Sequence, residues 1–261
     1  MGFVEQGGIR YYQFDSLQGL GVVQGIYTRR GGVSPEPWRS LNLGGTVGDE
    51  RANVVENRRR IFDAMGLPVT SIFDCWQVHG TDVICATEPR PLDSPHRKAD
   101  AILTDRKEIT LFMRFADCTP IFLVDPVKQI VGMVHAGWRG TVDGVTARAV
   151  RQMEAQYGSR PEDIFAGIGP SICAAHYPVG PEVAEAAAAA FGAEVGRVLA
   201  RRNGSFHLDL WEANRLTLEK CGVRQIETAG ICTACHTEDW YSHRAERGKT
   251  GRFGALLTFA S

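Results

Sequence analysis

The 261-residue sequence lacks both the long apolar runs of membrane proteins and the charge imbalance of many nucleic-acid-binding proteins. No stretch approaches the roughly 18 consecutive apolar residues that a membrane-spanning helix needs. There are 29 Lys and Arg residues against 30 Asp and Glu residues, for a formal net charge of -1. A chain with this balance has no overall electrostatic attraction to nucleic acid or to a membrane surface. We therefore expect neither as a partner, and small molecules as ligands.

The beginning of the sequence also lacks a targeting signal. Its first residues have neither the basic start nor the apolar run of a secretory signal, and Gln6 stands where a myristoylation motif needs Ser or Thr. Seven cysteines, an odd number at irregular intervals, disfavour a disulfide framework in a chain of this size. These features predict a cytoplasmic location, with cysteines that act as thiolates, as metal ligands or not at all.

The sequence does contain alternating helix-like and strand-like segments. Hydrophobic residues make up 44% of the chain and no linker or repeat interrupts it, so we expect one domain over residues 1–261. Apolar periodicity and end signals predict helices at 49–65, 141–157, 181–192 and 209–221. Strands are predicted at 22–27, 72–78, 101–103, 109–115, 121–124, 130–134, 164–168 and 253–259. The short connection 125–128 requires antiparallel neighbours, so an α/β fold with a mixed sheet fits best.

Three segments place a side chain that can bind a metal at the end of an expected strand. They are Gln77-Val78-His79-Gly80, Ala116-Asp117-Cys118-Thr119-Pro120 and Val134-His135-Ala136-Gly137. A catalytic zinc ion typically has three protein ligands and a fourth position open to water or substrate, and two imidazoles with one thiolate make such a set. The intervals are too long for a local motif, however, so the spacing alone favours three unconnected polar residues.

The surroundings of these segments strengthen the metal hypothesis. Glycines and Arg139 follow His135 directly and lead into an expected helix, an arrangement that suits an anion. Arg58 lies in a basic run of a different expected helix, the one at 49–65. Neighbouring side chains of a helix point in different directions, so at most one or two of these basic residues can face a common site. The segment Ser242-His243-Arg244, in a loop that continues to Arg252, could hold phosphate or sugar groups, although a solvated basic loop explains it equally well.

A separate motif, Cys232-Thr233-Ala234-Cys235-His236, matches the attachment pattern of c-type haem. We reject a haem site, because such proteins are exported and the match is short. A zinc ribbon lacks its second Cys-x-x-Cys pair. A structural or redox role for Cys232 stays open.

Taken together, these segments resemble the YfiH-like family, whose members are also labelled laccase-domain proteins, polyphenol oxidases or peptidoglycan editing factors. The resemblance runs over nearly the whole chain and also includes Leu41-Asn42-Leu43-Gly44 and Gly167-Ile168-Gly169-Pro170-Ser171. It implies a single α/β domain with layered mixed β-sheets flanked by helices. The sequence departs from the pattern at Cys173-Ala174-Ala175-His176-Tyr177, where many relatives carry Cys-Cys-Tyr-Glu after the Gly-Pro pair.

The resemblance also implies a function. It implies zinc ligands at His79, Cys118 and His135, and phosphorolysis of purine nucleosides such as adenosine, inosine or methylthioadenosine, with deamination of adenosine as a second activity. Asp117 is then either a proton acceptor or a support for the neighbouring ligand. The expected catalytic residues are Cys118, His135 and Asp117, and the expected contacts to nucleoside and phosphate are Asn42, Arg58, Arg139, Ser242 and Arg244.

Other functions stay open at this point. A copper-dependent polyphenol oxidase would need many imidazoles, but the sequence has seven histidines and no His-x-His pair, so at most a single copper with a weak ligand such as Met133 is conceivable. Cys118 could instead be the nucleophile of a hydrolase that acts on a peptidoglycan precursor, with His135 as its base. Zinc could also only stabilise the fold. The usual zinc-deaminase motif is absent, since Thr81 stands two residues after His79. Either a monomer or a homodimer is compatible with the sequence.

Overall fold

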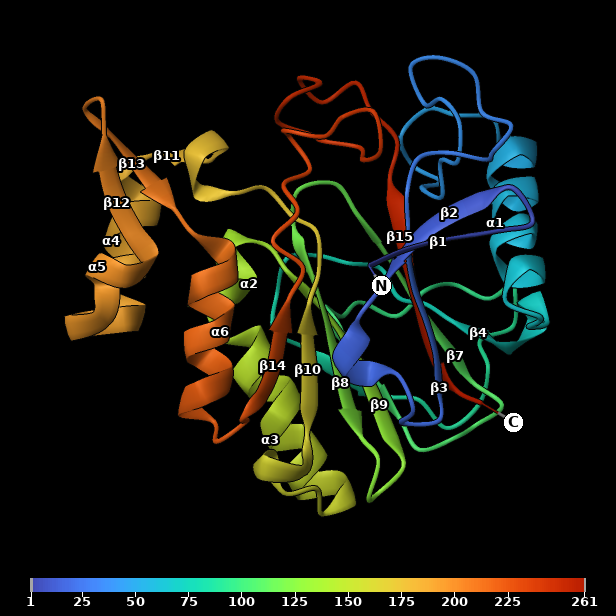
Figure 1. Ribbon diagram of the computed structural model, residues 1–261, viewed down its shortest axis with the longest axis horizontal. Helices are drawn as coiled ribbons and strands as arrows, with labels where there is room; N and C mark the ends of the chain where they lie inside the picture. Colours follow the sequence, from blue (N-terminus) through green and yellow to red (C-terminus); the bar gives the residue numbers. More distant parts are fainter. Residues whose placement is uncertain (1, 261) are drawn as a thin grey trace.

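Two six-stranded sheets form the framework of the computed structural model, which describes residues 2–260 (Figure 1). The two terminal residues of the predicted domain 1–261 therefore lie outside the described residues. In hydrogen-bonded order the first sheet contains β1 (Gly2–Gln6), β2 (Ile9–Gln13), β3 (Val22–Tyr27), β15 (Phe253–Phe259), β7 (Thr110–Phe115) and β4 (Ile72–Phe73). The second contains β14 (Gln225–Thr228), β10 (Phe165–Ile168), β8 (Thr119–Asp125), β9 (Ile130–Ala136), β6 (Ala101–Thr104) and β5 (Val83–Cys85). A small third sheet contains β11 (Pro178–Val179), β13 (Ser205–Leu208) and β12 (Leu199–Arg202).

Helices cover the outer faces of both large sheets. They are α1 (Arg51–Ala64), α2 (Trp138–Val142), α3 (Val145–Tyr157), α4 (Pro181–Phe191), α5 (Val195–Val198) and α6 (Leu210–Lys220). Short 3-10 helices are η1 (Asp15–Leu17), η2 (Val69–Ser71), η3 (Pro161–Asp163), η4 (Ala174–His176) and η5 (Gly192–Glu194). Figure 1 shows α1 outside the first sheet and α3 and α6 outside the second, with α4, α5 and the small sheet at the far edge.

The main core lies between the two large sheets. Phe115 and Phe253 of the first sheet belong to the same buried cluster as Phe122 and Met133 of the second. Every residue of β8 and β9 is buried, because one face meets the first sheet and the other meets α3. Cys118 directly precedes β8 and His135 is the penultimate residue of β9, so both are held by fully buried strands.

The structure confirms the predicted mixed α/β fold and most predicted elements. β8 and β9 form the expected antiparallel hairpin across residues 125–128, while β4, β5 and β14 pair in parallel with their neighbours. Two helices have the expected end signals: α4 begins at Pro181, and the side chain of Asp209 accepts a hydrogen bond from the Glu212 N–H at the start of α6.

Three predictions of secondary structure were wrong. The single helix at 141–157 is two helices, because the chain breaks at Gly144 with φ of 82° after α2 has already begun at Trp138. The strand at 72–78 ends at Phe73, because the following residues leave the sheet to enclose a buried ion cluster around Asp74. Strands β1, β2, β5 and β11–β14 were not predicted, since their segments of two to five residues are too short to show a clear alternation.

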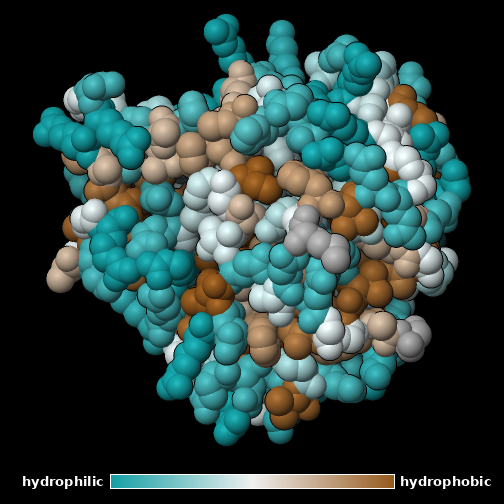
Figure 2. Space-filling model, in the orientation of Figure 1, coloured by the Kyte–Doolittle hydropathy of each residue, from teal (hydrophilic) through white to brown (hydrophobic). Residues whose placement is uncertain are grey.

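The face of the molecule seen in Figure 2 has no single dominant apolar region. On the face drawn in Figure 2, brown hydrophobic residues are interspersed among teal hydrophilic ones. No helix within residues 2–260 is long and apolar enough to cross a membrane. Trp76, which is 47% exposed, is the largest exposed apolar side chain, and it lies at the cavity described below.

Candidate functional site

His79, Cys118 and His135 come together although they lie far apart in the sequence. Each offers one potential ligand atom, and these atoms all lie within 4.8 Å of one another. The rings of His79 and His135 have centroids 4.9 Å apart at an angle of 70°. His135 is buried, Cys118 is half-buried and His79 is exposed, so the group opens to one side. This arrangement could hold one metal ion and leave a position facing outwards.

The two large sheets position this group. β7 ends in the first sheet at Phe115, and the chain crosses through Ala116, Asp117 and Cys118 to begin β8 in the second sheet. The hairpin register pairs Pro120 with His135, which brings Cys118 close to His135. His79 has φ of 59° and Asp117 has φ of 80°, a left-handed conformation that is uncommon outside glycine. Such conformations cluster at functional sites.

Asp100 anchors both histidines. Its Oδ1 accepts hydrogen bonds from His135 Nδ1 at 2.8 Å and from the His79 N–H at 3.0 Å. Its Oδ2 accepts the N–H groups of Val78 at 3.1 Å and Gly80 at 2.7 Å. Because the carboxylate occupies Nδ1, the Nε2 atom of His135 is the one free to bind a metal. A carboxylate behind a ligating histidine fixes the tautomer and the orientation of the ring.

The charges of this group favour a bound cation. Burial of the Cys118 thiol would raise its pKa, but the adjacent His135 and His79 rings outweigh burial and lower the pKa to about 6. Burial would lower the pKa of His135, but the Cys118 thiolate and Asp100 raise it to about 9. Burial would likewise raise the pKa of Asp100, yet its hydrogen bond from His135 keeps that pKa below the usual value. At neutral pH the site therefore contains a thiolate and a carboxylate around one imidazolium.

Gly137 lets the ligands approach one another. A Cβ atom added at this residue would lie 2.9 Å from Cys118 Sγ and 3.0 Å from His79 Cδ2. Both distances are shorter than ordinary contacts, so any larger residue would displace the thiol or the imidazole. The glycine that follows β9 is thus required by packing at the site itself.

A cavity of about 420 Å³ opens beside the three residues. Four aromatic side chains line it, namely Trp76, Phe115, Trp138 and Tyr177. Its basic lining residues are Arg114, His243, Arg244 and Arg252, and Gln77 and Asp117 also line it. Flat aromatic faces beside cations suit a ligand with a planar heterocycle at one end and an anion at the other.

Behind one of the basic lining residues, Arg114, lies an excess of buried positive charge. The fully buried carboxylate of Asp74 contacts Arg90 at 2.7 Å, Arg114 at 3.4 Å and Arg58 at 3.9 Å, together with His96 at 3.0 Å. One carboxylate therefore faces three guanidinium groups. Burial first, and then the neighbouring arginines, lower the pKa of Arg58 to about 10. The uncompensated charge reaches the cavity through Arg114.

The structure places several of the expected substrate contacts differently. Of the five, only Arg244 lines the cavity, and Arg58, Arg139, Asn42 and Ser242 do not. Arg58 is held below the cavity wall by Asp74 and the Phe112 ring, because α1 packs against the first sheet. The guanidinium of Arg139 lies 5.2 Å from the Trp138 ring, because α2 begins at Trp138 and turns this side chain aside.

Asn42 and Ser242 instead support the loops that carry the cavity cations. The Oδ1 atom of Asn42 accepts the N–H groups of Gly44 and Arg252 at 3.0 and 2.9 Å. The hydroxyl of Ser242 accepts the Ala245 N–H at 3.1 Å and thereby shapes the turn after His243. Both side chains are fully buried and thus hold the loops in place.

Asp117 lines the cavity, but both of its carboxylate oxygens already accept hydrogen bonds. Oδ1 accepts the Thr233 hydroxyl at 2.7 Å, and Oδ2 accepts the Arg244 N–H at 2.7 Å. Its main-chain oxygen accepts the Ile172 N–H at 3.0 Å. This geometry favours support of the Cys118 turn over proton transfer, the alternative that the sequence left open.

Sequence reasoning did not assign roles to Asp100 and Arg114, and it included Arg252 only as part of a basic loop that could hold phosphate or sugar groups. Asp100 stands in the Ala99-Asp100-Ala101 segment directly before β6, a position typical of functional loop residues. Arg114 interrupts an otherwise buried strand, which is a signal that could have been used. Arg252 had no distinguishing signal beyond its basic loop.

Comparisons with known proteins agree with this architecture. A family model described as multi-copper polyphenol oxidoreductase laccase matches residues 23–260. The Bacillus subtilis protein named purine nucleoside phosphorylase YlmD is 39% identical over 247 residues, which cover 90% of this chain and 88% of the relative. The Escherichia coli protein named purine nucleoside phosphorylase YfiH is 34% identical over 240 residues, which cover 92% and 95%.

Solved structures of similar proteins have the same fold. A crystal structure of YlmD from Geobacillus stearothermophilus superposes with a TM-score of 0.93 at 33% identity and covers 100% of this chain and 99% of its own. A Bacillus licheniformis hypothetical protein YfiH gives a TM-score of 0.92 at 31% identity and covers 98% of both chains. The layered mixed α/β fold implied by the sequence resemblance is thus confirmed.

Proposed function

The chain belongs to the YfiH-like family, and from this membership we propose that it is a purine nucleoside phosphorylase whose active site is the cavity beside His79, Cys118 and His135. The observation that carries the proposal is that one cavity is lined by three potential metal ligands, four aromatic side chains and four basic side chains. Relatives at 34–39% identity carry the name of this activity.

The donor set fits zinc. Two imidazoles and one thiolate form a common zinc site with an open position, and Asp100 supplies the carboxylate that such histidines usually have behind them. When bound here, zinc supplies a Lewis acid that can polarise an oxygen or nitrogen atom of the substrate. The proposed role of Asp100 is to keep the proton on Nδ1 of His135, so that Nε2 stays available.

The cavity walls suggest how the two substrates would bind. We place the purine against the aromatic side chains of Trp76 and Phe115, and phosphate against Arg114 and Arg252. A phosphate oxygen would then attack the anomeric carbon of the ribose while the bond between that carbon and the purine nitrogen breaks. The base leaves with the bonding electrons and takes up a proton, and ribose 1-phosphate remains. Holding both substrates side by side removes much of the entropic barrier to this step.

Deamination of adenosine belongs to the proposal as a second reaction of the same cavity. It replaces the amino group of the purine by a water oxygen and releases ammonia, so it needs no phosphate. The two reactions can therefore be separated by leaving phosphate out.

Copper oxidation is less well supported by the chemistry of the site, although the family description mentions it. The groups of metal-capable side chains found among residues 2–260 contain no more than two imidazoles each. Met133, the conceivable weak copper ligand, is buried in the core between the sheets. A multi-copper oxidase needs several coppers and correspondingly many imidazoles.

The test is to incubate purified protein of measured metal content with inosine or adenosine, with and without phosphate. Phosphorolysis predicts free base and ribose 1-phosphate only when phosphate is present, and Cys118→Ala should abolish both. The matched control is Cys221→Ala, a half-buried thiol at the end of α6 that lies outside the cavity. Turnover by Cys118→Ala equal to that of the wild type would overturn the assignment. Phosphate-independent release of free base, or oxidation of a phenol without nucleoside turnover, would overturn the reaction.

A further inference from the structure

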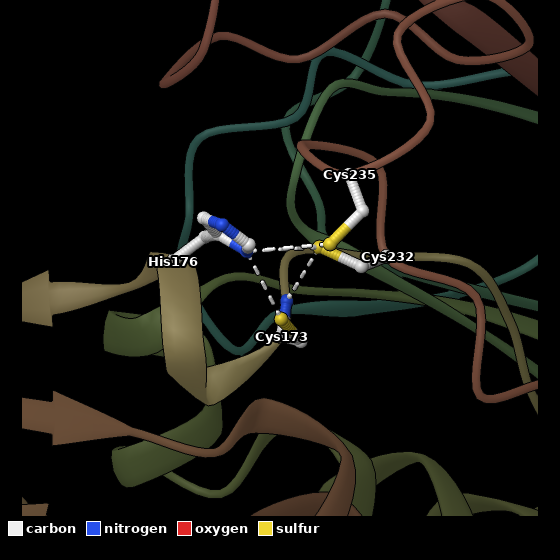
Figure 3. A group of neighbouring side chains, drawn as sticks. All are labelled: Cys173, His176, Cys232 and Cys235. Carbon is white, nitrogen blue, oxygen red and sulfur yellow. Dashed lines mark hydrogen bonds between the residues drawn. The ribbon is translucent and has the colours of Figure 1, made fainter.

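A second group of metal-capable side chains lies outside the cavity. It consists of Cys173, His176, Cys232 and Cys235, whose potential ligand atoms all lie within 4.8 Å of one another. Figure 3 shows Cys173 and His176, around η4, facing Cys232 and Cys235 on the loop after β14. All three cysteines are free thiols. This group provides what the Cys232-Thr233-Ala234-Cys235 motif lacked in the sequence, a second pair of ligands from elsewhere in the chain.

The distances match a tetrahedral centre. Nδ1 of His176 lies 3.4 Å from Cys173 Sγ, 3.3 Å from Cys235 Sγ and 4.0 Å from Cys232 Sγ. In a tetrahedral zinc site, bond lengths of about 2.3 Å to sulfur and about 2.0 Å to nitrogen put each nitrogen–sulfur edge near ~3.5 Å. The three observed edges bracket that value. The three sulfur atoms and the imidazole nitrogen, all within 4.8 Å of one another, are therefore spaced as the ligands of one tetrahedral ion would be.

The main chain prepares the site. A β-bridge joins Ser171 to Cys232, and the flanking hydrogen bonds Ser171 N–H to Ile231 O and Thr233 N–H to Ser171 O hold the two segments in register. The N–H of Cys173 donates to Cys232 Sγ at 3.3 Å. Main-chain donors to sulfur stabilise a thiolate, which is the form that binds metal. His236, the last residue of the sequence motif, turns away to Glu238 and takes no part.

We propose that Cys173, His176, Cys232 and Cys235 form a second metal site of this protein, a closed structural zinc site with three thiolates and one imidazole. Four protein ligands leave no position for a substrate, so this zinc would hold the chain in place and take no part in the chemistry. The identity of the metal follows from the ligands, because thiolates and an imidazole in tetrahedral geometry are typical of zinc.

The location gives this site a consequence for the cavity. Tyr177 follows His176 directly and lines the cavity, where the Arg244 guanidinium lies 5.1 Å from its ring. Thr233 follows Cys232 and donates its hydroxyl to Asp117, next to Cys118. A zinc ion that joins the two segments would therefore fix one wall of the cavity and brace the Cys118 turn from behind.

The test counts metal ions per chain by elemental analysis of purified protein. Wild type should contain about two zinc ions, and Cys235→Ala and His176→Ala about one each. Cys118→Ala should also keep about one zinc, held by the second site. The Cys221→Ala control should keep both. This design separates the two proposals, because the zinc content of Cys118→Ala measures the second site even if the proposed function of the cavity is wrong.

Cobalt substitution and mass measurement complete the test. Thiolate-to-cobalt absorption should persist in Cys118→Ala and fall sharply in Cys235→Ala, since the second site supplies three of the four proposed thiolate ligands. If Cys235→Ala does not fold, Cys235→His, which can still ligate, should restore the second zinc. The proposal is overturned if Cys118→Ala contains no metal, or if the intact mass of the wild type is two hydrogens low because two of these cysteines form a disulfide.

Discussion

Replacing Asp100 by Asn tests the geometry of the candidate metal centre most sharply. The carboxylate accepts four N–H groups, two on each oxygen, from His135 Nδ1 and the main chain of residues 78–80. In Asp100→Asn one of those oxygens becomes an NH₂ group, which cannot accept. Two of these buried or part-buried N–H groups then lose their acceptor, at a cost of about 1–3 kcal/mol each. We expect the free energy of unfolding of the metal-free protein to fall by about 2–6 kcal/mol.

The same substitution should weaken metal binding. Loss of the carboxylate behind a ligating histidine typically lowers metal affinity by about 10–100-fold. Urea unfolding of the metal-free protein measures the first effect, and competition with a chelator measures the second. Asp82→Asn is the matched control, because Asp82 is an exposed carboxylate of the same loop region. If Asp100→Asn matches Asp82→Asn in both measurements, the proposed role of Asp100 is wrong.

Three further predictions concern the same cavity. Gly137→Ala places a Cβ 2.9 Å from Cys118 Sγ, so a chelator competition should show zinc affinity reduced by about 10–100-fold, which corresponds to about 1–3 kcal/mol of overpacking. The control is Gly196→Ala, where an added Cβ meets nothing within 4 Å, and it should leave zinc affinity unchanged. Arg252→Ala should raise the KM for phosphate by about 10–100-fold through loss of a charged hydrogen bond, whereas exposed Arg151→Ala should not, and an equal rise in both would contradict the anion role. Because the pKa of Cys118 is lowered to about 6 and that of His135 is raised to about 9, the metal-free site holds one proton between pH 6 and pH 9 that zinc must displace. Zinc affinity should therefore rise by about tenfold per pH unit in this range and stop rising above about pH 9. Calorimetry in buffers of different ionisation enthalpy measures the displaced proton, and a pH-independent affinity would contradict the pairing of Cys118 with His135.

The sequence singled out His79, Cys118 and His135 as candidate metal ligands because each stands at the end of an expected strand. β8 and β9 could be recognised from their apolar runs and their short connection, and that hairpin alone brings residue 118 close to residue 135. The convergence of His79 with them could not be derived from spacing, since it depends on how the first sheet packs against the second. The family resemblance supplied that information.

Roles that depend on how deeply a side chain is buried, or on pairing with residues far away in the sequence, were not predictable. The position of Arg58 on α1 gives its direction but not its burial beneath the cavity wall, where Asp74 holds it. Asp100 becomes an anchor only through the pairing of β6 with β9, which places it beside His135. Cys173 and Cys232 are 59 positions apart and meet because a β-bridge joins Ser171 to Cys232, and no local motif records such a bridge.

A crystal structure with anomalous data collected at the zinc absorption edge tests the central claim most directly. We predict an anomalous peak bonded to His79, Cys118 and Nε2 of His135, at about 2.3 Å from sulfur and about 2.0 Å from nitrogen, with its remaining position facing the cavity. A zinc-loaded crystal with no peak among these three side chains would contradict the claim.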